Sequence, residues 1–264
     1  MAEITGTTRL FGILADPIHH VRTPQAVNAA AQARGYDGVL VPMHVKPENL
    51  ASVVDGLRRM ENLGGVIVTV PHKTAIAALC DELSPSARRI GAVNAVRREA
   101  DGRLVGEMLD GAGFVRGLQV NGIDTSGMRA YLAGAGGAAN AIAFALAGAG
   151  VSSLTIANRT RAKADDLKAR LADAFPALPV EIGTPDPSGH HLVVNGTSLG
   201  LKDGDALPFD AERLTPDQIV AEIIMQPEET AILAAAKARG CCTHPGRPML
   251  AEQVALMCDF LGIR

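Results

Sequence analysis

Hydrophobic positions along the first hundred residues follow two spacings, one typical of buried strands and one typical of amphipathic helices. Residues 9–14, 39–45 and 65–70 are short apolar runs bounded by Gly, Pro or Asp, so we expect three strands there. Between them, residues 24–34 and 47–60 carry apolar side chains at helical spacing. The pattern predicts alternating strands and helices.

Further signals refine this first part. Thr23 is the expected N-cap of the first helix, with Pro24 in its first turn. After Pro71 we expect another helix at residues 74–83. Residues 93–96 and 103–107 predict a hairpin whose turn contains Asp101-Gly102.

The alternation starts again after residue 130. It predicts strands at 130–133, 153–157, 180–182, 191–195 and 219–224, and helices at 138–147, 161–175, 230–239 and 249–261. Repeated strand–helix alternation indicates an α/β architecture with parallel sheets. We expect the boundary between the two parts near residues 110–117.

Composition excludes several functional classes. The net charge of −3 offers no basic surface for nucleic acid, and the absence of Trp argues against base stacking as a main function. No apolar run reaches the ~18 residues that span a bilayer, and the N-terminus lacks a hydrophobic signal core. The four cysteines match no metal-site spacing. We expect a cytoplasmic protein with reduced thiols, no metal, a small-molecule substrate, and a monomeric or homodimeric state.

A glycine turn follows the strand at 130–133. Gly134-Ala135-Gly136-Gly137-Ala138-Ala139 has the form G-x-G-x-x-A between a predicted strand and a predicted helix. The first glycine permits the tight turn, the second lets a pyrophosphate approach the backbone, and the helix N-terminus offers free N–H groups. This context favours a dinucleotide site.

The end of the next strand indicates which dinucleotide is bound. An NAD site usually has an acidic residue there, which accepts from the ribose hydroxyls. This chain instead has Asn158-Arg159-Thr160, followed by Lys163. Arg159 and Lys163 would attract a 2′-phosphate, so we expect NADP; the alternative is that both cations are simply solvated.

Short segments in a fixed order resemble the shikimate dehydrogenase family over nearly the whole chain. They are Asp16-Pro17-Ile18-His19-His20-Val21-Arg22-Thr23-Pro24, Val68-Thr69-Val70-Pro71-His72-Lys73, Ile90-Gly91-Ala92-Val93-Asn94, Asp110-Gly111-Ala112-Gly113-Phe114, the glycine turn, Asn158-Arg159-Thr160, Asn195-Gly196-Thr197-Ser198-Leu199-Gly200 and Gly246-Arg247-Pro248-Met249-Leu250-Ala251-Glu252-Gln253. The resemblance implies a substrate-binding catalytic domain at 1–110 and a Rossmann-like NADP-binding domain at 111–240. It also implies that a C-terminal helix, within 241–264, packs back on the substrate domain.

The resemblance also implies the roles of individual residues. Lys73 and Asp110 form the acid–base pair that moves the hydroxyl proton during hydride transfer. His72 is interpreted as structural. The substrate positions are Val21, Thr23, Thr69, Asn94, Met225 and Gln253. The cofactor positions are Gly134, Ala135, Gly136, Gly137, Ala138, Asn158, Arg159, Thr160, Lys163, Thr197, Ile223 and Gly246.

Lysine 73 also has a physical argument in its favour. It follows a buried parallel strand, at the edge where such sheets bind ligands. The helix expected at 74–83 would place this cation near a helix N-terminus. A cation there is destabilised by the helix dipole, so its side chain either points into water or has a catalytic role. Without the resemblance, Asp110 would be interpreted as a loop or cap residue.

The substrate positions depart from the family pattern. Where the family has two serines that hold the substrate carboxylate, this chain has Val21 and Thr23. Where the family has an assisting tyrosine, this chain has Met225. The usual Asn at 67, Asn-Thr at 108–109 and Thr at 95 are Ile67, Met108-Leu109 and Ala95. Each lost hydrogen bond to a carboxylate costs ~1–3 kcal/mol. Either another cation compensates, with Arg22 the nearest candidate unless it faces solvent, or the substrate is not shikimate.

Three functions are compatible with this sequence. The first is interconversion of shikimate or a shikimate-like cyclic hydroxy acid with its 3-dehydro ketone. The second is the same chemistry on a less polar cyclic alcohol in an accessory pathway. The third is a non-catalytic NADP-binding sensor, against which Lys73 and Asp110 argue, since a sensor needs no acid–base pair.

Overall fold

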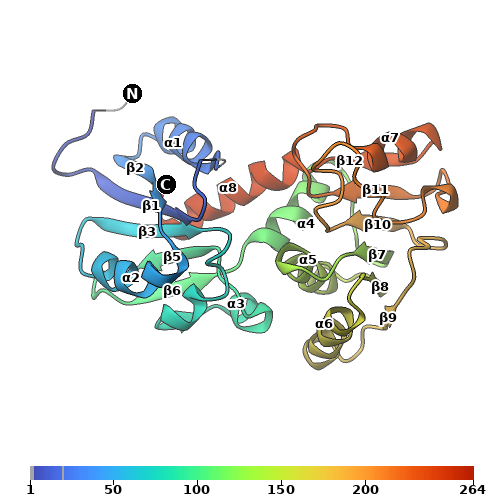
Figure 1. Cartoon of the computed structure of the whole chain (residues 1–264). Helices are drawn as coiled ribbons and strands as arrows, with labels where there is room; N and C mark the ends of the chain where they lie inside the picture. Colours follow the sequence, from blue (N-terminus) through green and yellow to red (C-terminus); the bar gives the residue numbers. More distant parts are fainter. Residues whose placement is uncertain (1–2, 20) are drawn as a thin grey trace. The chain divides into compact units, whose positions relative to one another are not determined.

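The chain forms two compact α/β units, each with its own sheet (Figure 1). The structure, a computed structural model, describes residues 3–19 and 21–264. One unit runs up to Leu109 and includes Gln253–Arg264; the other is Asp110–Glu252. His20, the motif histidine, lies outside the described residues.

The sheet of the first unit is mixed. Its described strands are β1 (Arg9–Ala15), β2 (Gly38–His44), β3 (Leu63–Val68), β4 (Glu82–Leu83), β5 (Ala95–Arg98) and β6 (Leu104–Glu107), in the order β2-β1-β3-β5-β6-β4. The strands β1, β2 and β3 are parallel, whereas β5 is antiparallel to both β3 and β6. The turn at Gly102, with φ +88°, returns the chain directly and so produces the predicted hairpin.

Helices of the first unit differ in places from the expected ones. They are α1 (Thr23–Ala33), α2 (Leu50–Arg58) and α3 (Pro85–Ile90), with 3₁₀ turns η1 (Pro47–Asn49) and η2 (Ile76–Leu79). Thr23 is already helical, and Arg22 occupies the N-cap position without a side-chain cap. The single helix expected at 47–60 is instead the 3₁₀ turn η1 followed by α2, which ends at Arg58.

The helix expected at 74–83 does not form. The helical part of this segment is limited to η2, Cys80 is already extended, and Glu82–Leu83 form β4. The chain must be extended after η2 because β4 pairs with β6, and Ser84 then caps α3 immediately before Pro85. Sheet pairing and the proline-started helix outweigh the helical propensity of the alanines in this segment.

The second unit has a parallel sheet. Its described strands are β7 (Arg129–Ala133), β8 (Ser153–Ala157), β9 (Val180–Ile182), β10 (Leu192–Asn195), β11 (Ile219–Glu222) and β12 (Cys242–His244), in the order β12-β11-β10-β7-β8-β9. Its helices are α4 (Asp110–Val120), α5 (Gly137–Gly148), α6 (Arg161–Ala174) and α7 (Ala231–Ala238), with the 3₁₀ turn η3 (Ala211–Arg213). All five described strand pairs are parallel, as a Rossmann-like sheet requires.

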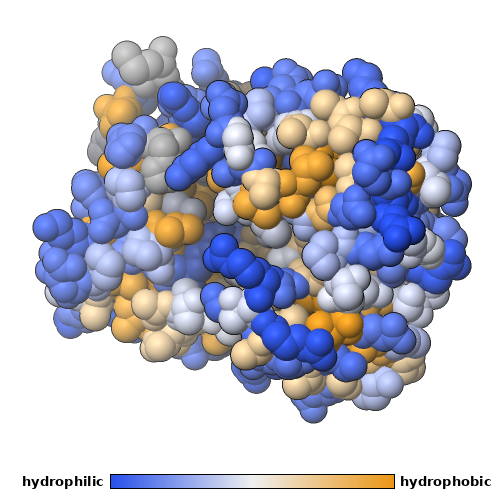
Figure 2. Space-filling model, turned by 45° about the vertical axis from the view of Figure 1, so that its right-hand side comes forward, coloured by the Kyte–Doolittle hydropathy of each residue, from blue (hydrophilic) through white to orange (hydrophobic). Residues whose placement is uncertain are grey.

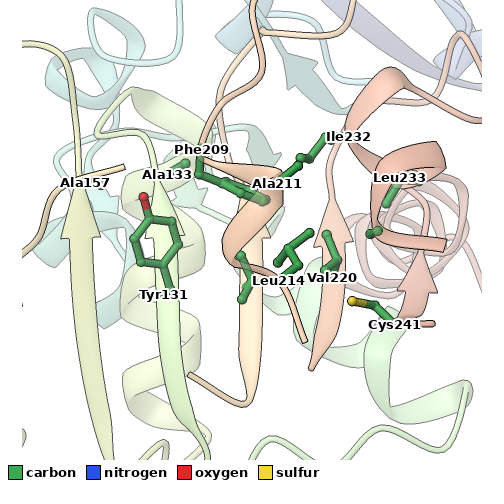
Figure 3. Packing of buried hydrophobic residues seen from close by; sticks show 12 residues of the cluster. Tyr131, Ala133, Ala157, Phe209, Ala211, Leu214, Val220, Ile232, Leu233 and Cys241 are labelled. Carbon is green, nitrogen blue, oxygen red and sulfur yellow. The ribbon is translucent and has the colours of Figure 1, made fainter. Parts of the chain in front are cut away.

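The core of the second unit joins strands to α7. Figure 3 shows Tyr131 of β7 near Phe209, and the packing continues through Val220 of β11 to Leu233 of α7, which belong to the same buried cluster. The Tyr131 and Phe209 rings meet edge to face, with centroids 5.7 Å apart. The Tyr131 hydroxyl donates to the Thr184 carbonyl at 3.0 Å, so this buried phenol keeps a partner. This packing fixes the strand ends on which the cofactor positions lie.

The C-terminal part of the chain differs from the expectation for 241–264. Residues 242–244 form β12 in the second sheet, and α8 (Arg247–Leu261) begins two residues before the helix expected at 249. The part of α8 up to Glu252 belongs to the second unit, and Gln253 begins the part that belongs to the first. Helix α4 was not predicted, because its glycines hide the helical spacing.

The surface mixes hydrophobic and hydrophilic side chains. On the face shown in Figure 2, hydrophobic areas are bordered by hydrophilic residues. The large exposed apolar side chains are Ile4, Met60, Val70, Val120, Leu201, Leu207 and Met225. No helix in residues 3–19 and 21–264 combines the length and the apolar character needed to cross a membrane.

Candidate active site

The motif segments of the first unit meet at one edge of its sheet. Because β1 and β3 are parallel neighbours, their carboxyl ends lie together. The Thr69 N–H donates to the Leu14 carbonyl at 3.1 Å, and the Asp16 N–H donates to the Val70 carbonyl at 3.2 Å. These bonds tie the segment after β1 to the segment that leads to Lys73.

Backbone contacts fix the position of Lys73 on both sides. The Val93 N–H donates to the Lys73 carbonyl at 2.8 Å, and the His72 N–H donates to the Thr69 carbonyl at 2.9 Å. The buried His72 ring has its Nε2 2.7 Å from the Val45 carbonyl oxygen, which agrees with its structural interpretation. The turn at 69–73 is therefore anchored before and after the lysine.

Lys73 does not lie beside the N-terminus of an α-helix. The sequence predicted a helix at 74–83, but the helical structure there is limited to the 3₁₀ turn η2. A four-residue turn has little macrodipole to disfavour a cation. The case for Lys73 therefore depends on its place after β3 and on the motif match.

Asn94 organises the chain around it. This side chain is fully buried. The backbone carbonyl of Asn94 accepts from the Val68 N–H at 2.8 Å, and its backbone N–H donates to the Glu107 carbonyl at 2.9 Å. Its side-chain Oδ1 accepts from the Leu109 N–H at 2.9 Å. Asn94 thus holds the end of β3 and also the residue that precedes Asp110.

The carboxylate-binding positions of the first unit lie at the start of α1. Val21 and Thr23 are both half-buried, and the Val21 N–H donates to the Ile18 carbonyl at 3.1 Å. Arg22, the proposed substitute cation, has an exposed side chain, and none of the ion pairs between described residues includes it. Its exposure favours the solvated interpretation.

The remaining catalytic and substrate positions are divided between the units. Asp110 is buried and begins α4, where a carboxylate is favourable to the helix dipole. Met225 follows β11 and is 40% exposed. Lys73, Thr69, Asn94 and Gln253 belong to the first unit, and Asp110 and Met225 to the second. The pairing of Lys73 with Asp110 stays a prediction.

The glycine turn of the second unit requires its first glycine. Gly134 has φ +114°, and a Cβ there would lie 3.0 Å from the Gly196 carbonyl oxygen. Its N–H donates to the Ala157 carbonyl at 2.7 Å. Gly136, the N-cap of α5, and Gly137 are exposed and have open space around them. The α5 N-terminus can therefore accept a phosphate against its backbone.

Asn140 holds this turn from within α5. Its Nδ2 donates to the carbonyls of Ala135 at 3.0 Å and Gly136 at 2.8 Å, and its Oδ1 accepts from Arg170 of α6. The carbonyls are thereby drawn toward the helix. Asn140 was missed at the sequence level because the glycine pattern does not specify this position.

Two cations follow β8, Arg159 in the loop and Lys163 in the first turn of α6. Asn158 Nδ2 donates to the Thr160 carbonyl at 2.8 Å, which shapes the turn into α6. Arg159 and Lys163 are exposed and form no ion pair with any described residue, whereas nearby Arg161 pairs with Asp165 at 3.0 Å. Two unpaired cations near a helix N-terminus fit a bound anion such as a 2′-phosphate.

The other cofactor positions follow the remaining strands. Thr197 comes after β10, Ile223 after β11 and Gly246 after β12. A Cβ at Gly246 would lie 2.5 Å from the Ile224 carbonyl oxygen, so only glycine fits there. Together with the turns after β7 and β8, the predicted cofactor positions lie at the carboxyl ends of five neighbouring parallel strands. These residues fit a dinucleotide, and no metal-binding group of His, Cys, Asp or Glu was found within the described ranges.

Comparisons with known proteins match most of the chain. The shikimate dehydrogenase substrate-binding domain matches residues 13–96, and the shikimate/quinate 5-dehydrogenase family matches residues 118–181. A shikimate dehydrogenase (NADP(+)) of Rubrobacter xylanophilus is 42% identical over 95% of this chain and 89% of its own.

Solved structures agree. Shikimate 5-dehydrogenase from Listeria monocytogenes, in complex with shikimate and NAD, has a TM-score of 0.94 and 33% identity, and the match covers 100% of this chain and 95% of that one. The 5-ketofructose reductase of Gluconobacter sp. strain CHM43 has a TM-score of 0.90 and 35% identity over 97% of this chain and 94% of its own. The chain therefore belongs to the shikimate dehydrogenase family and is an enzyme of the oxidoreductase class.

Proposed function

We propose that the chain interconverts shikimate, or a shikimate-like cyclic hydroxy acid, with its 3-dehydro ketone, and that its cofactor is NADP. The observation that carries this proposal is the anchored Lys73 turn in a chain 42% identical to an NADP-dependent shikimate dehydrogenase. Arg159 and Lys163, which form no ion pair within the part of the chain that the structure describes, support NADP as the cofactor.

The proposed acid–base pair is Lys73 and Asp110. NADP, when bound, would supply the hydride acceptor for alcohol oxidation and the hydride donor for the reverse reaction. As the substrate C–H bond breaks, the Lys73 amine takes the hydroxyl proton, and the C–O bond becomes a carbonyl. Asp110 accepts a hydrogen bond from the Lys73 amine, which directs the lysine lone pair to the substrate hydroxyl, and it stabilises the lysine once it is cationic. In the reverse direction Lys73 returns the proton.

A less polar substrate is the second candidate. Ile67, Ala95 and Met108 are buried apolar residues where the family pattern is polar, and Met225 replaces the assisting tyrosine. The similarity to a 5-ketofructose reductase adds a relative whose named substrate has no carboxylate. This candidate retains Lys73, Asp110 and NADP and changes only the recognition of the substrate.

Steady-state kinetics tests these proposals. NADP reduction would be followed with shikimate, with cyclic alcohols that lack the carboxylate, and with 5-ketofructose in the direction of NADPH oxidation. If shikimate has the highest kcat/KM of the tested substrates, the first candidate is supported. A carboxylate-free substrate with a higher kcat/KM supports the second. Cofactor binding without turnover of any of them would favour the sensor and contradict both.

A further inference from the structure

Glu222 is a fully buried carboxylate at the end of β11, and the acid–base chemistry proposed above does not use it. The Thr230 hydroxyl lies 2.9 Å from each of its oxygens, and Asn195 Nδ2 donates to Oε2 at 3.4 Å. Burying an unpaired carboxylate is costly, so its retention here is offset by these two donors. Burial raises its pKa, and the two hydrogen bonds act in the opposite direction.

The partners of Glu222 hold the loop after β10. Asn195 Oδ1 accepts from the Thr197 N–H at 3.1 Å and from the Thr197 hydroxyl at 2.7 Å, and its Nδ2 also donates to the Leu199 carbonyl at 3.0 Å. Thr197 Oγ1 in turn accepts from the Leu199 N–H at 3.0 Å. The orientation of the Asn195 amide thus sets the conformation of residues 195–199.

The loop after β11 is held at both of its ends by the same carboxylate. Glu222 ends β11, and Thr230 is the N-cap of α7, where its hydroxyl also accepts from the Leu233 N–H. The residues between them include Ile223 and Met225. Thr230 also packs 3.3 Å from the position that a Cβ on Gly200 would occupy, so the two loops meet at this residue.

Strand order indicates which half of the dinucleotide these loops face. The sheet runs β12-β11-β10-β7-β8-β9, with the glycine turn after β7 and Arg159 after β8. A dinucleotide whose pyrophosphate lies at β7 and whose 2′-phosphate lies at β8 extends its other half over β10 and β11. That half carries the nicotinamide ribose.

We propose that Glu222 is a positioning residue for the nicotinamide half of the cofactor, acting through Asn195 and Thr230 on the loops after β10 and β11. The inference rests on the proposed NADP site. Glu222 need not contact the cofactor. It fixes the shape that Thr197 and Ile223 present to the cofactor, while the adenosine half binds at β8 independently of this network.

Two ligands separate these effects. Adenosine 2′,5′-bisphosphate carries the adenosine half of NADP and lacks the nicotinamide ribose. Calorimetric titration would measure the affinities for NADP and for the bisphosphate. The proteins compared are the wild type, Glu222→Gln, Thr230→Val and, as a matched control, Thr230→Ser, which keeps the hydroxyl. We expect Glu222→Gln and Thr230→Val to weaken NADP about tenfold, the loss of roughly one charged hydrogen bond. The bisphosphate should change less than about twofold, and Thr230→Ser should resemble wild type.

The remaining outcomes each have a defined meaning. If both variants weaken the two ligands equally, or neither ligand at all, Glu222 has only a packing role and the inference is overturned. Should Glu222→Gln not fold, Thr230→Val alone decides between the same outcomes, since it keeps the carboxylate and removes its main donor. A wild type that binds neither ligand overturns the proposed NADP function, and this inference with it.

Discussion

Ile67 and Ala95 lie directly opposite each other in the antiparallel pair formed by β3 and β5, and both are buried. These are two of the positions at which the family pattern has polar residues. The changes are therefore spatial neighbours, and each provides an apolar environment for the other. Paired replacement of this kind keeps the sheet free of unpaired polar groups.

This pairing predicts coupled effects on stability. Ile67→Asn alone should lower the free energy of unfolding by on the order of 3 kcal/mol, because an amide would be buried beside Ala95 without a partner. Ala95→Thr added to it should recover part of that loss, since the hydroxyl offers a partner across the strands. Urea unfolding of the wild type, both single variants and the double variant measures the coupling. Strictly additive effects would show that the two sites are independent.

The cations after β8 predict cofactor preference. NADP should bind at least about tenfold more tightly than NAD, because Arg159 and Lys163 form no ion pair with a described residue and no carboxylate ends the strand. Arg159→Ala should weaken NADP and leave NAD nearly unchanged. Lys168→Ala, within α6 and nine residues beyond Arg159, is the control. Equal wild-type affinities for both cofactors in a fluorescence titration would refute the assignment.

The proposed acid–base pair predicts loss of turnover with retained cofactor binding. Lys73→Ala should lower kcat by ~10²–10⁴-fold, the usual contribution of a general acid–base group. Asp110→Asn should behave similarly, because an amide can hydrogen-bond but cannot stabilise a cationic lysine. NADP affinity should stay near wild type in both variants. Lys46→Ala, at an exposed lysine of the same unit as Lys73, should stay active. Retention of more than about a tenth of the wild-type rate by Lys73→Ala would exclude this role.

Sequence patterns predicted most of the fold because the relevant spacings are local. The strand ends and the glycine turn near Gly134 follow from residues a few positions apart. Residues 74–83, where the predicted helix does not form, show that local spacing does not specify pairing between distant strands. Their alanines favour a helix, but β4 must reach β6 some twenty residues further on, and nothing local signals that pairing.

The candidate site divides in the same way. Lys73, Asp110 and Arg159 lie in recognisable motifs, so they could be named from the sequence. Glu222 and Asn140 could not, because their roles depend on partners such as Thr230 and Arg170 that are distant in sequence or outside any pattern. A buried glutamate at the end of an apolar strand is the one local signal that would have pointed to Glu222.

His244 predicts a loss of stability in acid. Among the described residues, the Nε2 of this buried histidine has no hydrogen-bond partner, and burial lowers the pKa of its ring below the ordinary value of 6.5. Below pH 6.5 the unfolded chain then binds more protons than the folded one, so the free energy of unfolding falls as the pH drops. His244→Leu should lose less stability than wild type between pH 7.5 and pH 5.5 in denaturant unfolding. Parallel losses in the two proteins would show that His244 does not contribute.

The carboxylate-binding positions predict a high KM for shikimate. Of the family's two serines and tyrosine, the chain keeps only the hydroxyl of Thr23, and Arg22 is exposed. Losing binding in the ground and transition states alike raises KM more than it lowers kcat. Val21→Ser, Thr23→Ser and Met225→Tyr together should therefore lower KM for shikimate, with non-additive single effects because all three would contact one carboxylate. A low KM in the wild type would show that another group binds the carboxylate. Arg22→Ala would then identify or exclude the remaining cation, since its loss should raise KM only if the guanidinium contacts the substrate.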